Sequence, residues 1–168
     1  MKKQTFDEYL FQGIEKLTFD GEIELNWDQS AFVFELNFTI QAQNTAHTAL
    51  EWTDQQGSEA VDDTDVVNYE DSVLFYDPNR LNGLDYADDY LTIVPFAGKK
   101  GLSKAVLDAF LANLQDTLDD GESDLMDFLD PDSQAETFEL TWDKARYDAY
   151  LAQQNPTAQQ QFLPYPKY

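Results

Sequence analysis

A run of alternating residues between positions 32 and 40 constrains the fold more than any other feature of the sequence. Phe32, Phe34, Leu36, Phe38 and Ile40 fall at every second position, and the residues between them are mostly polar. Neighbouring side chains of a β-strand point to opposite faces. The spacing therefore predicts a strand with one face in a hydrophobic core and the other near water, as in an antiparallel sheet.

Other segments add strands to this one. Alternation or strand-forming composition predicts them at residues 23–27, 46–53, 72–76, 90–96 and 138–142. Turn residues between them favour a meander, and the acidic stretch at 54–68 predicts a loop. We therefore expect a mostly antiparallel sheet of about five or six strands.

Three helices are predicted from capping residues followed by apolar residues at helical spacing. Thr5 and Glu8 have the spacing of a capping box, Ser103 begins a long helix, and Asp143 caps a later one. Gly121 is expected to break or bend the long helix. Strands precede most of the helices, so we expect an α+β fold with the helices packed on one face of the sheet.

The length of 168 residues suits one domain. Hydrophobic residues make up 42% of the chain and aromatic residues 14%, which is enough to build a core despite the high charge. We expect a single α+β domain over residues 1–155. Residues 156–168 are rich in glutamine and proline and have no periodic pattern, so an irregular C-terminal tail is predicted there.

The strongest compositional signal is acidity. Thirty-three Asp and Glu against ten Lys and Arg give a net charge of −23, which opposes binding to nucleic acid or anionic lipid. Cysteine is absent, which excludes disulfides and thiolate chemistry, and no apolar run approaches the ~20 residues of a membrane helix. We expect a cytoplasmic protein with no direct nucleic-acid or membrane contact.

One local cluster of cations departs from this acidity. Lys99, Lys100, Gly101, Ser103 and Lys104 lie where the long helix is predicted to start. Free amides, the helix dipole and lysines at such a position could hold a phosphate or carboxylate, although the spacing of a phosphate-binding loop is absent. The alternative is a strand-to-helix turn whose lysines pair with nearby acids.

The remaining candidates for chemistry are weak. His47 is the only histidine, and no serine nucleophile motif accompanies it. Four aspartates around Gly121 approach a calcium-loop register, but Leu118 occupies a ligand position. These are Asp116, Asp120, Asp124 and Asp127. We therefore assign no catalytic residue, metal site or cofactor.

The three tryptophans allow two interpretations. Trp27, Trp52 and Trp142 each follow a leucine by two residues, which could indicate a shared aromatic binding face. The other interpretation is that strand ends deliver these large rings to the core, and we favour this one.

Five strings resemble a known family in their order and spacing. They are ELNWD at 24–28, DSVLFY at 71–76, KKGLS at 99–103, DLMDFL at 124–129 and FELTWD at 138–143. They are similar to a family of small acidic proteins of unknown function from low-GC Gram-positive bacteria, the Firmicutes. The resemblance implies a bacterial cytosolic origin and transfers no catalytic or binding residues.

These observations lead to one functional expectation with two alternatives. We expect a non-enzymatic domain that acts through protein contacts and favours a basic partner. A nucleic-acid-mimicking inhibitor of a DNA-binding protein is the first alternative. A small-anion-binding or catalytic domain centred on residues 99–104 is the second. The sequence fixes neither the partner nor the oligomeric state.

Overall fold

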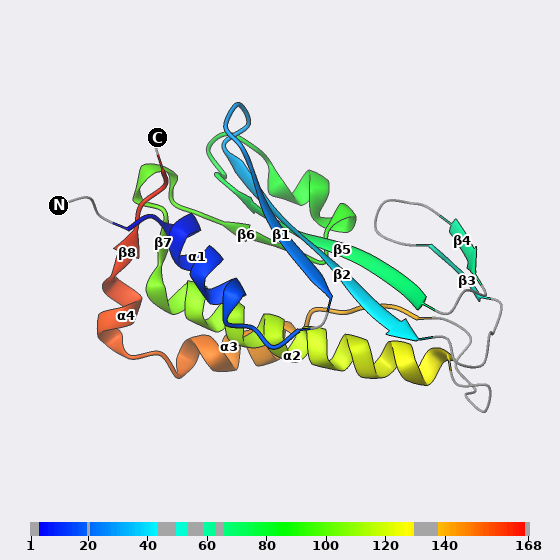
Figure 1. Ribbon diagram of the computed structural model, residues 1–168. Coiled ribbons are helices and arrows are strands. Elements are labelled where there is room, and N and C mark those ends of the chain that lie inside the picture. The colour runs from blue at the N-terminus through cyan, green and yellow to red at the C-terminus, as the bar shows by residue number, and fades with distance from the viewer. Residues whose placement is uncertain are drawn as a thin grey trace.

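The alternating run forms the central strand of the protein. The computed structural model describes residues 4–19, 21–43, 50–53, 59–62, 66–129 and 138–166. The elements, in order, are α1 (Phe6–Glu15), β1 (Glu22–Asp28), β2 (Val33–Gln43), β3 (Leu50–Thr53), β4 (Glu59–Asp62), β5 (Val66–Tyr76), the 3₁₀ helix η1 (Gly83–Asp89), β6 (Thr92–Pro95), the 3₁₀ helix η2 (Gly98–Lys100), β7 (Leu102–Ser103), α2 (Lys104–Leu129), α3 (Lys144–Ala152), α4 (Pro156–Gln160) and β8 (Phe162–Leu163). The α+β class is confirmed (Figure 1).

The strand β2 contributes one side to the core, as its alternation predicts. Phe34, Leu36, Phe38 and Ile40 are all buried, whereas the residues between them are only partly covered. Phe32 lies in the β1–β2 turn with a φ of 57°, so the strand begins one residue later than the pattern suggests.

The main sheet is mixed. Its strands lie in the order β1-β2-β5-β6. The β1–β2 and β2–β5 pairings are antiparallel, as expected, but β5 and β6 are parallel. The predicted meander is therefore wrong at its last step. The connection that contains η1 carries the chain back along the sheet, so β6 begins alongside the second half of β5 and runs in the same direction. The described strands also form two separate two-stranded sheets, β3–β4 and β7–β8.

Two predicted segments differ locally from the expectation. The segment predicted as a loop at 54–68 contains β4 and the start of β5, while residues 54–58 and 63–65 lie outside the described ranges. Residues 138–142 form no strand, although Phe138 and Leu140 are buried. Alternating burial therefore arises there without a hydrogen-bonded partner strand.

The helices α1, α2 and α3 lie on one side of the main sheet (Figure 1). The long helix α2 supplies most of the buried helical surface, through Leu107, Phe110, Leu114 and Leu118. It runs unbroken through Gly121, contrary to expectation. A Cβ at this position would lie 2.7 Å from Ile40 Cδ1 and 2.8 Å from Leu140 Cδ1, so the glycine permits close packing and ends nothing.

Two of the three predicted caps have the expected hydrogen bonds. Ser103 Oγ accepts from the Val106 amide at 3.2 Å, and Asp143 Oδ1 accepts from the Arg146 amide at 3.0 Å. Thr5 precedes α1, but its hydroxyl donates to the Glu8 carboxylate at 3.1 Å and makes no capping bond to the backbone.

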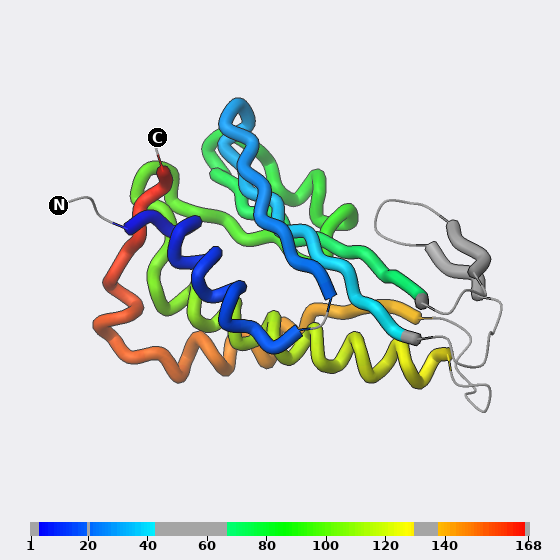
Figure 2. Tube along the Cα trace, viewed as in Figure 1, coloured from blue at the N-terminus to red at the C-terminus, as the bar shows by residue number. Residues whose placement is uncertain are grey.

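The described part of the segment predicted as an irregular tail, residues 156–166, has regular elements and packs against the rest of the protein. It contains α4 and β8, and β8 pairs with β7. Tyr165 is buried against the rings of Phe6, Phe34 and Phe96, and its hydroxyl accepts from Trp27 Nε1 at 2.7 Å. The tail has no periodic pattern because its residues pack singly against different elements, where it approaches α1 (Figure 2).

Candidate functional site

The side of the main sheet that faces away from α2 carries a group of carboxylates. They are Glu22, Glu24 and Asp28 of β1, Glu35 of β2 and Glu70 of β5, which we call the acidic face. They alternate with the apolar residues that point toward the helices, so strand geometry places them together. Toward the end of β5 this side of the sheet is covered, since Leu74 and Tyr76 are buried.

The strand register brings these carboxylates into rows. Glu22 and Glu70 both pair with Thr39 from opposite sides, which separates their backbones by about 10 Å. Glu24 follows Glu22 by two residues, a rise of about 7 Å. With Asn37 they line a shallow cavity of about 250 Å³.

Two members of the acidic face have hydrogen-bond partners. Asp28 accepts from the hydroxyl of Ser30 at 2.7 Å and from the amide of Ala31 at 3.2 Å. These bonds hold the pKa of the Asp28 carboxyl below its usual value. Glu35 accepts from the Tyr90 hydroxyl at 3.1 Å. Burial and the charge of Glu35 raise the pKa of Tyr90 to about 12, so the phenol stays protonated at neutral pH.

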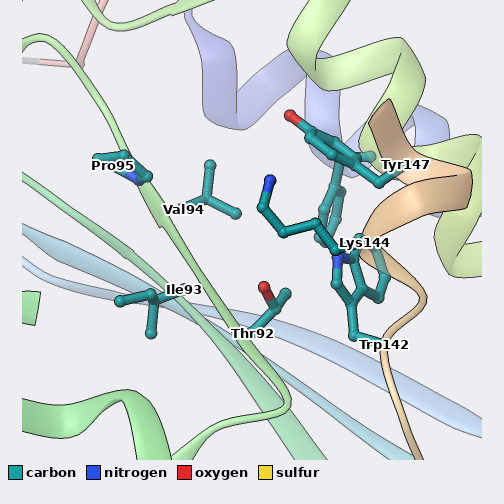
Figure 3. A pocket seen from close by; sticks show the side chains of 8 residues that line it. Thr92, Ile93, Val94, Pro95, Trp142, Lys144 and Tyr147 are labelled. Atoms are coloured by element: carbon teal, nitrogen blue, oxygen red, sulfur yellow. The ribbon is translucent and has the colours of Figure 1, made fainter. Parts of the chain in front are cut away.

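A second candidate site is a cleft of about 230 Å³ between β6 and the start of α3. Its lining consists of residues 92–95 of β6, Phe110 of α2, and Trp142, Lys144 and Tyr147. Figure 3 shows the rings of Trp142 and Tyr147 opposite the β6 side chains, with Lys144 extending between them. We call it the aromatic cleft.

The aromatic cleft has a wall of packed rings and a cation in an exposed ion pair. The Trp142 ring lies 5.4 Å from that of Phe110 and 6.2 Å from that of Tyr147, centroid to centroid. Lys144 Nζ is 3.2 Å from Asp148 Oδ1, but both side chains are well exposed, so the pair is weak. Burial, and then the charge of Asp148, raise the pKa of the Tyr147 phenol.

Sequence reasoning did not find the aromatic cleft. The spacing around Trp142 predicts a large ring at a strand end, and the residues of β6 that complete the cleft lie about fifty positions earlier in the chain. Among the tryptophans, Trp27 stacks on Phe34 with centroids 5.5 Å apart, which supports the packing interpretation for that residue. The side chain of Trp52 lies outside the described part of the protein.

The cation cluster at 99–104 lies in a turn that the C-terminal segment covers. Lys99 and Lys100 are exposed in η2, whereas Gly101 and Ser103 are buried. The Gly101 amide donates to the Gly98 carbonyl at 3.1 Å, and the Lys104 amide donates to the Gln161 carbonyl at 2.8 Å. Both amides are thus engaged within the protein. Lys100 Nζ lies 4.0 Å from the centre of the Phe162 ring.

Two of the four aspartates near Gly121 hold α3 against α2. Arg146 NH1 donates to Asp120 at 2.9 Å, and its Nε lies 3.7 Å from an Asp116 oxygen. The same Nε donates to the buried Asn113 Oδ1 at 2.6 Å. Partial burial lowers the pKa of Arg146, but the bond to Asp120 and the charge of Asp116 outweigh it and raise the pKa. We call these contacts the Arg146 clasp.

The described ranges contain neither a metal-ligating cluster nor a membrane-spanning helix. No group of three or more His, Cys, Asp or Glu side chains there is arranged to hold a metal ion. No helix in those ranges combines the length and apolar character needed to cross a membrane. His47 lies outside the described residues, as do Asp63 and Asp65 of the acidic stretch.

Comparison with known proteins places the chain in a group without an assigned activity. A family model described as "Protein of unknown function (DUF3013)" matches residues 1–167. A solved structure of a conserved protein of unknown function from Enterococcus faecalis, a Firmicute, is 37% identical, with a TM-score of 0.81. The match covers 99% of this chain and 97% of that one. No curated protein matches. The resemblance to an uncharacterised Firmicute family is confirmed.

Proposed function

The chain belongs to the DUF3013 family of proteins of unknown function, and we propose that it is a cytoplasmic, non-enzymatic interaction domain that binds a basic protein partner. The acidic face is the observation that carries this proposal. Four of its five carboxylates are exposed, and α1, α2 and α3 lie on the other side of the sheet.

The electrostatics of the acidic face favour a cationic ligand. The strands β1, β2 and β5 carry no Lys or Arg, and several of the five carboxylates lie within about one Debye length of each other. Their mutual repulsion opposes folding, whereas lysines or arginines of a partner would relieve it. Charge complementarity of this kind mainly raises the association rate and the specificity, and salt weakens it.

A second candidate function is mimicry of nucleic acid. Such mimicry needs negative charges on a rigid surface, and the acidic face lies on three hydrogen-bonded strands. Under this proposal the basic partner is a DNA-binding protein that the chain inhibits. The third possibility, an anion site at residues 99–104, would require Lys99 and Lys100 to act without the Gly101 and Lys104 amides.

The test compares two triple variants of equal charge. E22Q/E24Q/E70Q removes three charges from the acidic face, and D119N/D124N/D127N removes three exposed charges from α2. A partner is captured from a lysate of the native cells, eluted over a salt series, identified and purified. We expect a basic protein whose Kd rises roughly tenfold with the first triple and less than twofold with the second.

The remaining outcomes separate the alternatives. Displacement of the partner by competing DNA supports mimicry, and its persistence supports an ordinary docking domain. Equal effects of the two triple variants on Kd would show that only net charge matters and would refute the proposal that the acidic face is the binding surface. Loss of a bound anion in K99E/K100E, with no partner captured, would favour the site at residues 99–104.

A further inference from the structure

We propose that the aromatic cleft binds a small aromatic carboxylate, with the ligand ring between β6 and Trp142 and its carboxylate on Lys144. This inference goes beyond the proposed function, since it concerns another surface and does not depend on a protein partner. It rests on the size of the cleft, the character of its walls and the sign of its charge.

The size of the cleft suits a ligand with one aromatic ring. Its volume is about 230 Å³. An apolar protein cavity of about 150 Å³ is already large enough for benzene. The difference leaves space for a short polar chain that reaches the mouth of the cleft.

The walls of the cleft suit a flat apolar group. Val94 and Phe110 are buried beside it, with 7% and 0% of their surfaces exposed. Trp142 and Tyr147 present their rings on the opposite side (Figure 3). A ligand ring placed between them gains burial together with edge or offset ring contacts. Phe110 also packs edge-on against Phe75 of the core, which keeps this part of the wall in place.

The charge of the cleft is unusual for this protein. No Asp or Glu lines it, and Lys144 is its ionised group. Three other cavities in the described part of the chain all contain carboxylates: the cavity on the acidic face, one between α1 and α2 with Asp108, and one beside Arg146 with Asp120 and Asp124. Among these four cavities, the aromatic cleft is therefore the one whose lining is most favourable to an anion in a chain of net charge −23.

Lys144 can reach a ligand because its present partner holds it weakly. Its side chain is 77% exposed and that of Asp148 is 58% exposed. A pair of this kind contributes little and reforms easily. More distant carboxylates are screened at physiological salt, where the Debye length is about 8 Å.

The experiment uses two probes with the same ring and the same three-carbon chain, one ending in a carboxylate and the other in a neutral hydroxyl. The intact protein is titrated with 3-phenylpropionate and with the neutral 3-phenylpropan-1-ol, and binding is followed by NMR shifts of backbone amides and tryptophan indoles. Both probes should shift residues 92–94 and the Trp142 indole. The carboxylate should bind more tightly.

Three variants test the assignment. K144Q should weaken 3-phenylpropionate roughly fivefold, the scale of one exposed charge contact, and change the neutral probe less than twofold. K16Q is the matched control, because Lys16 lines the cavity between α1 and α2 and should leave both probes unchanged. T92F places a ring in the cleft and should abolish the binding of both probes.

Several results would overturn the proposal. These are the absence of saturable binding, shifts centred on residues 99–104, equal affinity for the two probes, and binding unaffected by K144Q or by T92F. Unchanged amide shifts outside the cleft, recorded for K144Q and T92F themselves, would show that these substitutions leave the fold intact.

Discussion

Gly101 illustrates how a single residue depends on a contact far along the chain. Its φ of 80° and ψ of −132° lie in a region that residues with a side chain rarely adopt. A Cβ at Gly101 would lie 1.9 Å from the Leu163 carbonyl oxygen. The turn before α2 and the strand β8 can therefore approach each other only because this position has no side chain.

We predict that G101A destabilises the protein by about 2–4 kcal/mol, because it adds backbone strain to a clash with the backbone of β8. Urea unfolding would measure this. G98A is the control: Gly98 has a φ of 50°, a left-handed conformation that costs an alanine only about 1–2 kcal/mol. Equal losses in the two variants would contradict the role assigned to Leu163.

The sequence predicts two of the three local caps, at Ser103 and Asp143 but not at Thr5, and it does not predict roles that depend on distant neighbours. Ser103 and Asp143 cap helices through bonds that span three positions, so the sequence pattern is sufficient. Gly121 was expected to break α2, but a glycine is needed there because Ile40 and Leu140, both distant in sequence, pack against the helix at this position. The same distinction explains Gly101, whose partner lies some sixty positions later.

Among the elements, α3 depends most on polar contacts. None of its nine residues is buried. Trp142 and Tyr147 pack at its start, and the Arg146 clasp joins it to α2. Asn113, fully buried, also donates to the Asp143 carbonyl at 3.1 Å, so one polar network spans both helices.

We predict that R146M destabilises the protein by about 2–3 kcal/mol, because it leaves Asn113 Oδ1 without its donor and removes the cation beside Asp116 and Asp120. Amide hydrogen exchange should become faster in α3 and stay unchanged in the first turns of α2. K144M, which removes the exposed pair with Asp148 and a cation lying 5.7 Å from the centre of the Tyr147 ring, should change stability by less than about 0.5 kcal/mol. Uniformly faster exchange in R146M would argue against local detachment of α3.

Periodicity predicts elements well and their relative directions poorly. The strands β1 and β2 and the helices α1 and α2 follow from spacing alone, because each buries one continuous face. The parallel pairing of β5 and β6 does not, because alternation is the same in either direction. The C-terminal segment lacked any pattern, since α4 and β8 contribute single residues such as Ala158 and Leu163 to separate contacts.

At the scale of the whole molecule, several of the many carboxylates accept hydrogen bonds from tyrosine hydroxyls. Tyr9 donates to Asp108, Tyr90 to Glu35 and Tyr150 to Asp116. For Tyr9 and Tyr90 burial and then the carboxylate raise the phenol pKa, and for Tyr150 the hydrogen bond is the leading cause. The carboxylates therefore make the stability of the protein depend on pH in the range where tyrosines ionise.

We predict that stability falls as the pH rises from about 10 to about 12. The Tyr90 phenol has a usual pKa of 10.0, but in the folded protein its pKa is about 12. Its contribution is therefore complete below pH 10 and is lost as the pH rises through the folded value. The urea midpoint of the wild type should exceed that of Y90F at pH 8, and the difference should shrink toward pH 12. A difference independent of pH would contradict this.

Y86F is the control for this titration, because Tyr86 is 42% exposed, lies in the neighbouring η1 and makes the smallest of the contributions that raise the Tyr90 pKa. Its urea midpoints should follow those of the wild type across the series.

The acidic face could be anticipated only in part. Composition indicated a surplus of carboxylates, and alternation placed Glu22, Glu24 and Glu35 opposite apolar residues. The addition of Glu70 required the pairing of β5 with β2, which links residues about thirty positions apart. The aromatic cleft could not be anticipated, because a strand edge and a helix start meet there only after the chain has folded.

The ring cluster around Tyr165 has a consequence for biosynthesis. Phe6, Trp27, Phe34 and Phe96 all leave the ribosome before Tyr165 is added. Until then the end of the sheet nearest α1 lacks its central ring, and the indole of Trp27 lacks the acceptor that it has in the finished protein. The nascent chain therefore exposes aromatic surface at this end until Tyr165 has left the ribosome, which gives chaperones that bind such surface time to act there.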